Sequence, residues 1–119
     1  MSFRCLLVDD SEEFLASAVR LLESLGFVIV ATASNSSDAM RKVIELTPDI
    51  AFVDIELGTQ DGIALAEELQ GLSSSLRVIL ISAYDRDDMR DLISDSAAIG
   101  FLPKSDLGAD SIRTLLERA

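Results

Sequence analysis

Residues 49–55 read Asp-Ile-Ala-Phe-Val-Asp-Ile, a short apolar run with carboxylates beside it. Runs of this kind recur along the whole chain. They are Phe3 to Val8, Phe27 to Ala31, Ile50 to Val53, Leu76 to Ile81 and Ile99 to Leu102. The runs are nearly continuous in Val, Ile, Leu and Phe, which is typical of parallel strands that are covered on both faces. The sequence therefore predicts a parallel sheet with helices on both sides.

Segments of helical period separate these runs. Apolar residues at steps of three and four predict five helices, one after each run. Their apolar positions are Phe14, Ala18, Leu21, Leu22 and Leu25; Met40, Val43 and Ile44; Ile63, Leu65, Ala66 and Leu69; Met89, Leu92 and Ile93; and Ile112, Leu115 and Leu116. We expect Ser11 to cap the first helix and Gly26 to end it. We expect the second helix to end at Thr47-Pro48 and the third at Gly71.

The number of strand and helix units limits the topology. Crossover connections between parallel strands are almost always right-handed, and five units are too few to close an eight-stranded barrel. We therefore predict an α/β fold, a flavodoxin-like, doubly wound five-stranded parallel sheet of order 2-1-3-4-5 with five helices. The fifth strand becomes an edge, where Pro103 at its end is tolerated. The 119 residues fit one domain, 1–119.

Composition excludes several classes of function. Twenty-one acidic residues against ten basic ones give a formal charge of −11, with no basic stripe for binding nucleic acid directly. The chain has no histidine and one cysteine, Cys5, so zinc sites of His and Cys, Ser-His-Asp or Cys-His catalysis and a disulfide framework are excluded. No signal peptide or membrane span is predicted, so we expect a cytoplasmic protein with no membrane partner.

Polar side chains follow four of the predicted strands. Asp9 and Asp10 follow the first, Asp54 the third, Ser82 the fourth and Lys104 the fifth. In open α/β sheets ligands bind outside the carboxyl ends of the strands, so these side chains converge. Crowded carboxylates need a counter-charge, and oxygen ligands with room for water and phosphate favour Mg²⁺. The set is suited to phosphoryl transfer.

Each of these residues alone has an ordinary structural explanation. Asp9 and Asp10 are a common pair before a helix, Asp54 could be a loop acid, Ser82 a turn residue and Lys104 a solvated charge. Their convergence at one sheet edge favours a functional site instead.

The pattern resembles the receiver domain of bacterial two-component response regulators over the whole chain. The resemblance rests on Leu6 to Asp10, on Asp49 to Ile55 followed by Asp61-Gly62, on Ile81 to Ala83 and on Gly100 to Ser105. It implies that Asp54 accepts a phosphoryl group from a phosphohistidine on a sensor histidine kinase or phosphotransfer protein. It also implies that Asp10 binds Mg²⁺ directly and Asp9 through water, with Asp54 and the backbone carbonyl of Glu56 completing the ligands.

The resemblance further implies a conformational switch. Ser82 and Lys104 would contact the phosphoryl oxygens, and Phe101 matches the switch aromatic that swings inward as Ser82 moves. Ordinary edge-strand packing also explains Phe101. The output face for a downstream effector would be built from the fourth helix, the fifth strand and the fifth helix. Its arginines are Arg86, Arg90 and Arg113.

Three departures from the family pattern bear on the site. Ser105 follows Lys104 where many members have proline, so a cis peptide bond is not expected there. Leu57-Gly58 stands where Met-Pro is common, which predicts a more pliable loop. Glu56 and Tyr84 occupy positions that resemble tuners of phosphoryl lifetime. Glu56 would either pair with Lys104 or repel hydroxide, and Tyr84 would restrict water.

Two other functions remain open at this stage. One is a receiver-like interaction module that works without phosphate. The other is a Mg²⁺-dependent phosphatase or phosphotransferase acting on small molecules, which would need a lid that 119 residues do not leave room for. The sequence leaves open the kinase, the output, a homodimer, and whether the chain stands alone or belongs to a longer regulator with a helix-turn-helix domain.

Overall fold

The central sheet of the computed structural model has five parallel strands in the predicted order. The structure describes residues 3–83 and 96–118. The strands are β1 (Arg4–Val8), β2 (Val28–Ala33), β3 (Ile50–Asp54), β6 (Arg77–Ser82) and β7 (Gly100–Pro103). Their order is β2-β1-β3-β6-β7, which is the order 2-1-3-4-5 expected from the sequence. The flavodoxin-like prediction is therefore confirmed, and β7 is an edge strand.

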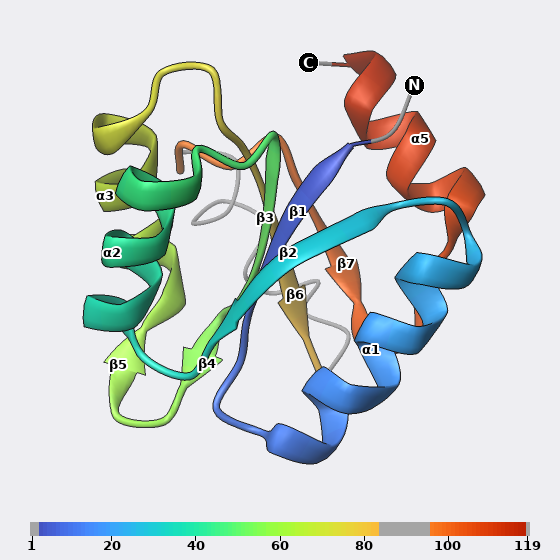
Figure 1. Cartoon of the computed structure of the whole chain (residues 1–119), viewed down its shortest axis with the longest axis horizontal. Helices are drawn as coiled ribbons and strands as arrows, with labels where there is room; N and C mark the ends of the chain where they lie inside the picture. Colours follow the sequence, from blue (N-terminus) through green and yellow to red (C-terminus); the bar gives the residue numbers. More distant parts are fainter. Residues whose placement is uncertain (1–2, 84–95, 119) are drawn as a thin grey trace.

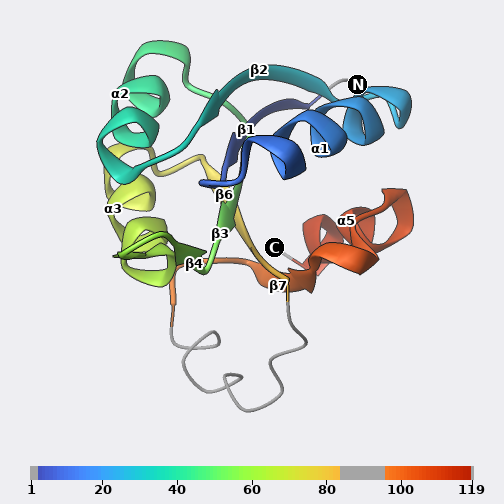
Figure 2. The same cartoon turned by 90° about the horizontal axis from the view of Figure 1, so that it is seen from below.

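Helices cover both faces of this sheet (Figures 1 and 2). The helices are α1 (Glu12–Ser24), α2 (Ser36–Leu46), α3 (Gly62–Leu72) and α5 (Ala109–Arg118), with a short 3₁₀ helix over Lys104–Asp106. α2 and α3 lie on one face, and α1 and α5 on the other. The helix predicted from Met89, Leu92 and Ile93 falls outside the described residues.

Strand β3 shows why the runs are continuous rather than alternating. Its side chains point to the two faces in turn, as they must in any strand. Ile50 and Phe52 pack with the residues under α1 and α5, whereas Ala51 and Val53 pack with those under α2 and α3. All five residues of β3 are buried. A strand with helices over both faces has no solvent side, so every position is apolar until Asp54.

The expected helix ends are largely confirmed. Ser11 caps α1, because its Oγ accepts a hydrogen bond of 3.2 Å from the Phe14 N–H. Gly26 follows that helix with φ +97°, and Thr47 ends α2 in the left-handed region. The prediction that Gly71 ends the third helix is wrong. α3 continues through Leu72 to a cap at Ser73, and Gly71 does not adopt the left-handed backbone that would stop it.

A small hairpin follows β3, where a pliable loop was expected. β4 (Glu56–Leu57) pairs antiparallel with β5 (Gln60–Asp61). Gly58 turns the chain with φ +62°, and the Leu57 side chain is buried in the core. The Oε1 atom of Gln60 accepts a hydrogen bond of 2.9 Å from the Ser36 N–H at the start of α2. Packing and this hydrogen bond therefore hold the segment.

Two further expectations concern the backbone and its environment. The Lys104–Ser105 peptide bond is trans, as expected in the absence of proline. Among residues 3–83 and 96–118, none of the helices combines the length and the apolar character needed to cross a bilayer.

Candidate functional site

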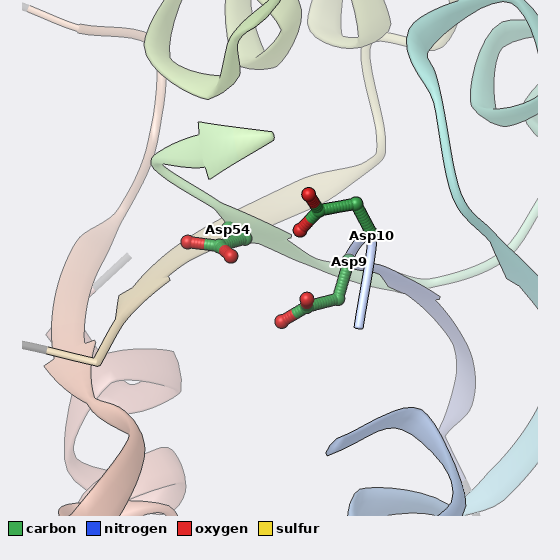
Figure 3. A group of neighbouring side chains, drawn as sticks. All are labelled: Asp9, Asp10 and Asp54. Atoms are coloured by element: carbon green, nitrogen blue, oxygen red, sulfur yellow. The ribbon is translucent and has the colours of Figure 1, made fainter. Parts of the chain in front are cut away.

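The three predicted carboxylates come together at the carboxyl end of the sheet. β1 and β3 are hydrogen-bonded neighbours, so the residues that end them are adjacent in space. Figure 3 shows the side chains of Asp9, Asp10 and Asp54 gathered at this edge of the sheet. One carboxylate oxygen from each residue lies within 4.8 Å of the others. The sequence-based expectation that these strand ends form one acidic cluster is confirmed.

Backbone groups fix two of these carboxylates. The Ser11 N–H donates to Asp9 Oδ1 over 2.8 Å, and the Glu56 N–H donates to Asp54 Oδ1 over 3.1 Å. Asp9 and Asp54 are buried, whereas Asp10 is exposed. One oxygen of each buried carboxylate is thus held by the chain segment that follows it. The second oxygen of each lies within 3.4 Å of the Lys104 ammonium.

Lys104 supplies a positive charge to this cluster. Its Nζ lies 2.6 Å from Asp9 Oδ2 and 3.4 Å from Asp54 Oδ2. The side chain is only 18% exposed, and it starts from the first residue of the 3₁₀ helix after β7. In the part of the chain that the structure describes, the ion pairs of Lys104 are with these two aspartates and not with Glu56.

The proton affinities of the site reflect this crowding. Burial and the negative charge of Asp9 raise the pKa of Asp54 to about 6, although Lys104 acts in the opposite direction. Burial alone lowers the pKa of Lys104, but its hydrogen bond to Asp9 and the charges of Asp54 and Asp9 outweigh this and raise that pKa. At neutral pH Asp54 is therefore mostly ionised, although burial and the charge of Asp9 disfavour that ionised form.

The donor set fits a hard divalent cation. All candidate ligands are oxygens, which suits Mg²⁺ better than a softer metal. Asp9 Oδ2 is buried, and its close partner within the described residues is the Lys104 ammonium, 2.6 Å away. Three carboxylates against one ammonium leave the site with excess negative charge, and a cation between the carboxylates would balance it. The exposed side chain of Asp10 leaves the site open to water and to an entering ion.

Comparison with known proteins decides the family. The chain matches the model of the response regulator receiver domain over residues 5–117. The chain belongs to this family. The match includes every strand and helix described above except the first residue of β1 and the last of α5. It also contains all of the site residues predicted from the sequence.

Several receiver-containing proteins resemble this receiver domain. It is 33% identical to the chemotaxis protein CheY of Bacillus subtilis over 89 residues, 75% of this chain and 74% of that protein. It is 32% identical over 118 residues to the transcriptional regulatory protein PrrA of Mycobacterium tuberculosis, covering 97% of this chain but only half of that one. The signal receiver domain of the regulator NarL from the same organism superposes with a TM-score of 0.83 at 27% identity, covering 98% and 94% of the two chains.

Three further residues predicted from the sequence are described by the structure, and a fourth is not. Ser82 ends β6 and is buried. Phe101 lies in β7, half-buried against the core under α2 and α3. Glu56 begins β4 with an exposed side chain. Tyr84 falls outside the described residues.

Three residues at the site were not predicted from the sequence to act there. A Cβ added to Gly62 would lie 1.9 Å from the carbonyl oxygen of Asp54, so only glycine fits at the start of α3. A Cβ on Gly58 would lie 3.5 Å from Asp10 Oδ2. The Phe14 ring lies beneath the Lys104 ammonium, whose Nζ is 4.1 Å from the ring centroid. Asp61-Gly62 was noted as a motif, but nothing in the helical pattern separates Phe14 from a core residue.

Proposed function

We propose that this receiver domain accepts a phosphoryl group on Asp54 from a phosphohistidine of a sensor histidine kinase or phosphotransfer protein. The observation that carries the proposal is the placement of Asp54. Its carboxylate ends a fully buried central strand, and it lies beside Asp9, Asp10 and the Lys104 ammonium. The 119 residues contain no histidine, so a phosphohistidine donor would lie outside them.

The chemistry follows from the groups at hand. A carboxylate oxygen of Asp54 attacks phosphorus, an O–P bond forms, the P–N bond to the donor imidazole breaks, and the imidazole takes up a proton as it leaves. With a pKa of about 6, Asp54 is mostly ionised at pH 7 and available as the nucleophile. Lys104 lies 3.4 Å from Asp54 Oδ2, within reach of an oxygen of the transferred group. Ser82 would bind another of these oxygens.

The acidic residues would hold the metal ion. We assign Asp10 as a direct ligand, Asp9 as a ligand through water, and Asp54 and the backbone carbonyl of Glu56 as the remaining protein ligands. Bound Mg²⁺ would neutralise charge on the phosphoryl oxygens during transfer. The protein contributes by keeping the carboxylates oriented through the Ser11 and Glu56 N–H groups. The excess of three carboxylates over one ammonium supports this assignment.

Phosphorylation would be transmitted to the edge strand. The added group carries about −1.5 to −2 charges at neutral pH, and would draw Ser82 and Lys104 toward Asp54. Phe101 lies in β7, three residues before Lys104, and would then turn inward. β7 and α5, with the exposed Arg113, would form part of the face that a downstream effector or output domain binds.

We further propose that Glu56 and Tyr84 set the lifetime of the phosphoryl group. The exposed carboxylate of Glu56 lies two residues beyond Asp54, where it would repel attacking hydroxide. Tyr84 would limit access of water. If Glu56→Ala and Tyr84→Ala leave the rate of dephosphorylation unchanged, this part of the proposal is wrong.

A phosphoryl donor tests the proposed function. The intact protein is incubated with acetyl phosphate in Mg²⁺ or in EDTA, and its mass is measured. We expect one added phosphoryl group in Mg²⁺ only, no addition to Asp54→Asn, and normal addition to the control Asp106→Asn, which neutralises an exposed acid outside the site. An adduct that survives Asp54→Asn, or no adduct in Mg²⁺, contradicts the proposal. The second result would favour a phosphate-independent interaction module.

A further inference from the structure

Phe14 is the one aromatic ring that contacts the charged groups of the site within the described residues. It lies in the first turn of α1, and the Lys104 Nζ lies over its ring, 4.1 Å from the centroid. The same ammonium lies 2.6 Å from Asp9 Oδ2 and 3.4 Å from Asp54 Oδ2. Lys104 therefore has three neighbours, and one of them is uncharged.

The backbone holds Phe14 in register with the acidic cluster. The Ser11 N–H donates to Asp9 Oδ1 over 2.8 Å, and the Ser11 Oγ in turn accepts from the Phe14 N–H over 3.2 Å. These two hydrogen bonds connect the carboxylate to the first turn of α1. The position of the ring relative to Asp9 is thus set by the helix cap rather than by side-chain packing alone.

We propose that Phe14 is a positioning residue that holds the Lys104 ammonium at the phosphoryl site. The role in phosphoryl transfer rests on the proposed function, whereas the contact itself does not. A lysine side chain is long and flexible, and its ammonium is attracted to the negative face of an aromatic ring. The ring therefore restricts Lys104 to the side of the site where it meets Asp54.

The ring differs from the two carboxylates in one respect that matters for function. Asp9 and Asp54 are also candidate ligands for a cation, so a bound cation shares the negative charge that attracts Lys104. A phenyl ring does not compete for Mg²⁺ among oxygen ligands. We therefore expect the contribution of Phe14 to the position of Lys104 to increase when the metal site is filled.

Simple packing is the competing explanation, because Phe14 also contacts the core under α1 and α5. Two substitutions separate the alternatives. Phe14→Leu keeps an apolar side chain but removes the ring face, and Phe14→Tyr keeps the ring. Phe3→Leu is a matched control, because Phe3 is a half-buried phenylalanine of the same cluster whose ring stacks on Phe27 rather than on a cation.

The first measurement does not depend on phosphorylation. In the NMR spectrum of the metal-free protein, the ring should shift the Lys104 ε-methylene protons upfield. We expect this shift in the wild type and in Phe14→Tyr, and its loss in Phe14→Leu but not in Phe3→Leu. In thermal unfolding, Phe14→Leu should cost less stability in a Lys104→Met background than in the wild type. Equal costs in the two backgrounds, or an unchanged lysine signal, would overturn the contact.

The second measurement addresses the role in transfer. With acetyl phosphate and saturating Mg²⁺, we expect Phe14→Leu to lower the rate of phosphorylation by roughly three- to tenfold, the range that a cation–π contact allows. Phe14→Tyr and Phe3→Leu should stay within about twofold of wild type on the same scale. Equal losses in Phe14→Leu and Phe14→Tyr would overturn the positioning role. If the wild type itself takes up no phosphoryl group, the proposed function fails, while the lysine signal still decides the contact.

Discussion

Strands β3 and β7 end at the same candidate site but differ in how they are held in the sheet. β3 lies between β1 and β6, all five of its residues are buried, and it ends in Asp54. Within residues 3–83 and 96–118, β7 pairs with β6 alone; it has one buried residue of four and leads into Lys104. The site therefore has a central half, Asp9, Asp10 and Asp54, and an edge half, Phe101 and Lys104. A displacement of the edge half would disturb the hydrogen bonds between β6 and β7 only, because no strand on the other side of β7 is described.

Two glycines give the largest expected contrast between the halves. A Cβ at Gly62 would lie 1.9 Å from the Asp54 carbonyl oxygen, which belongs to a central strand and cannot retreat. A Cβ at Gly100 in β7 would meet the end of the Leu115 side chain at 2.4 Å, which can rotate away. We expect Gly62→Ala to cost more than about 4 kcal/mol or to prevent folding, and Gly100→Ala about 1 kcal/mol. Urea unfolding followed by circular dichroism measures both. Equal costs would remove the distinction between the two strands.

Two phenylalanines test the same contrast through packing. Phe52 in β3 is fully buried, and Phe101 in β7 is half-buried. We expect Phe52→Ala to lower the free energy of unfolding by about 3–5 kcal/mol and Phe101→Ala by about 1–2 kcal/mol, because less contact area is lost at the edge. The free energies come from the same urea titrations. A cost at Phe101 equal to that at Phe52 would mean that the edge strand is as firmly packed as the center.

Removing the charge of Asp54, in the central half, is expected to raise the stability of the protein, whereas the substitutions above lower it. Burial and Asp9 raise the pKa of Asp54 from 3.8 to about 6, so the folded protein holds this proton more tightly than the unfolded chain does. Its stability therefore falls as pH rises between these two values. In EDTA at pH 7 we expect Asp54→Asn to be more stable than wild type by about 3 kcal/mol, since the pKa of Asp54 is raised by roughly two units and one unit corresponds to about 1.4 kcal/mol.

Thermal unfolding at two pH values checks this prediction. The advantage of Asp54→Asn should disappear near pH 3, where the wild-type carboxyl group is protonated, and added Mg²⁺ at pH 7 should stabilise the wild type more than the variant. The exposed Asp106→Asn serves as the control and should show neither effect. An advantage that persists unchanged at low pH would show that charge is not its cause.

The smallest expected effect concerns Pro103. This residue ends β7, and an edge strand has one side without a hydrogen-bonding partner. Pro103→Ala should therefore cost only about 0.5 kcal/mol, mostly through the greater freedom of the unfolded chain. Differential scanning calorimetry can resolve such a change. A loss above about 2 kcal/mol would place Pro103 in a constrained role that the edge position does not explain.

Much of the fold could be predicted because the strands are buried on both faces. The run from Ile50 to Val53 has no solvent side, so its composition alone identifies it. Elements that are too short to show a repeating pattern of apolar and polar residues could not be predicted. The strands of the hairpin after Asp54 have two residues each, too few to show alternation. Gly71 was expected to end a helix, but glycine can also occupy a helical position at a modest cost.

The site divides in the same way. Asp9, Asp10, Asp54 and Lys104 could be predicted because strand ends converge in this topology. Phe14 could not, because its contact with Lys104 joins residues ninety positions apart and its spacing is that of an ordinary core residue. The need for glycine at position 62 could not be predicted either, because it depends on how close the start of α3 lies to the backbone of Asp54, and only the three-dimensional structure gives that distance.

The central claim is that chemistry at Asp54 in the central half is transmitted to the edge half. Hydrogen exchange followed by mass spectrometry tests it directly, in Mg²⁺ with and without acetyl phosphate and with Asp54→Asn as reference. We predict that acetyl phosphate changes exchange in peptides covering residues 100–106, leaves residues 50–53 unchanged, and has no effect on Asp54→Asn. No change in residues 100–106, or the same change in Asp54→Asn, would contradict the account.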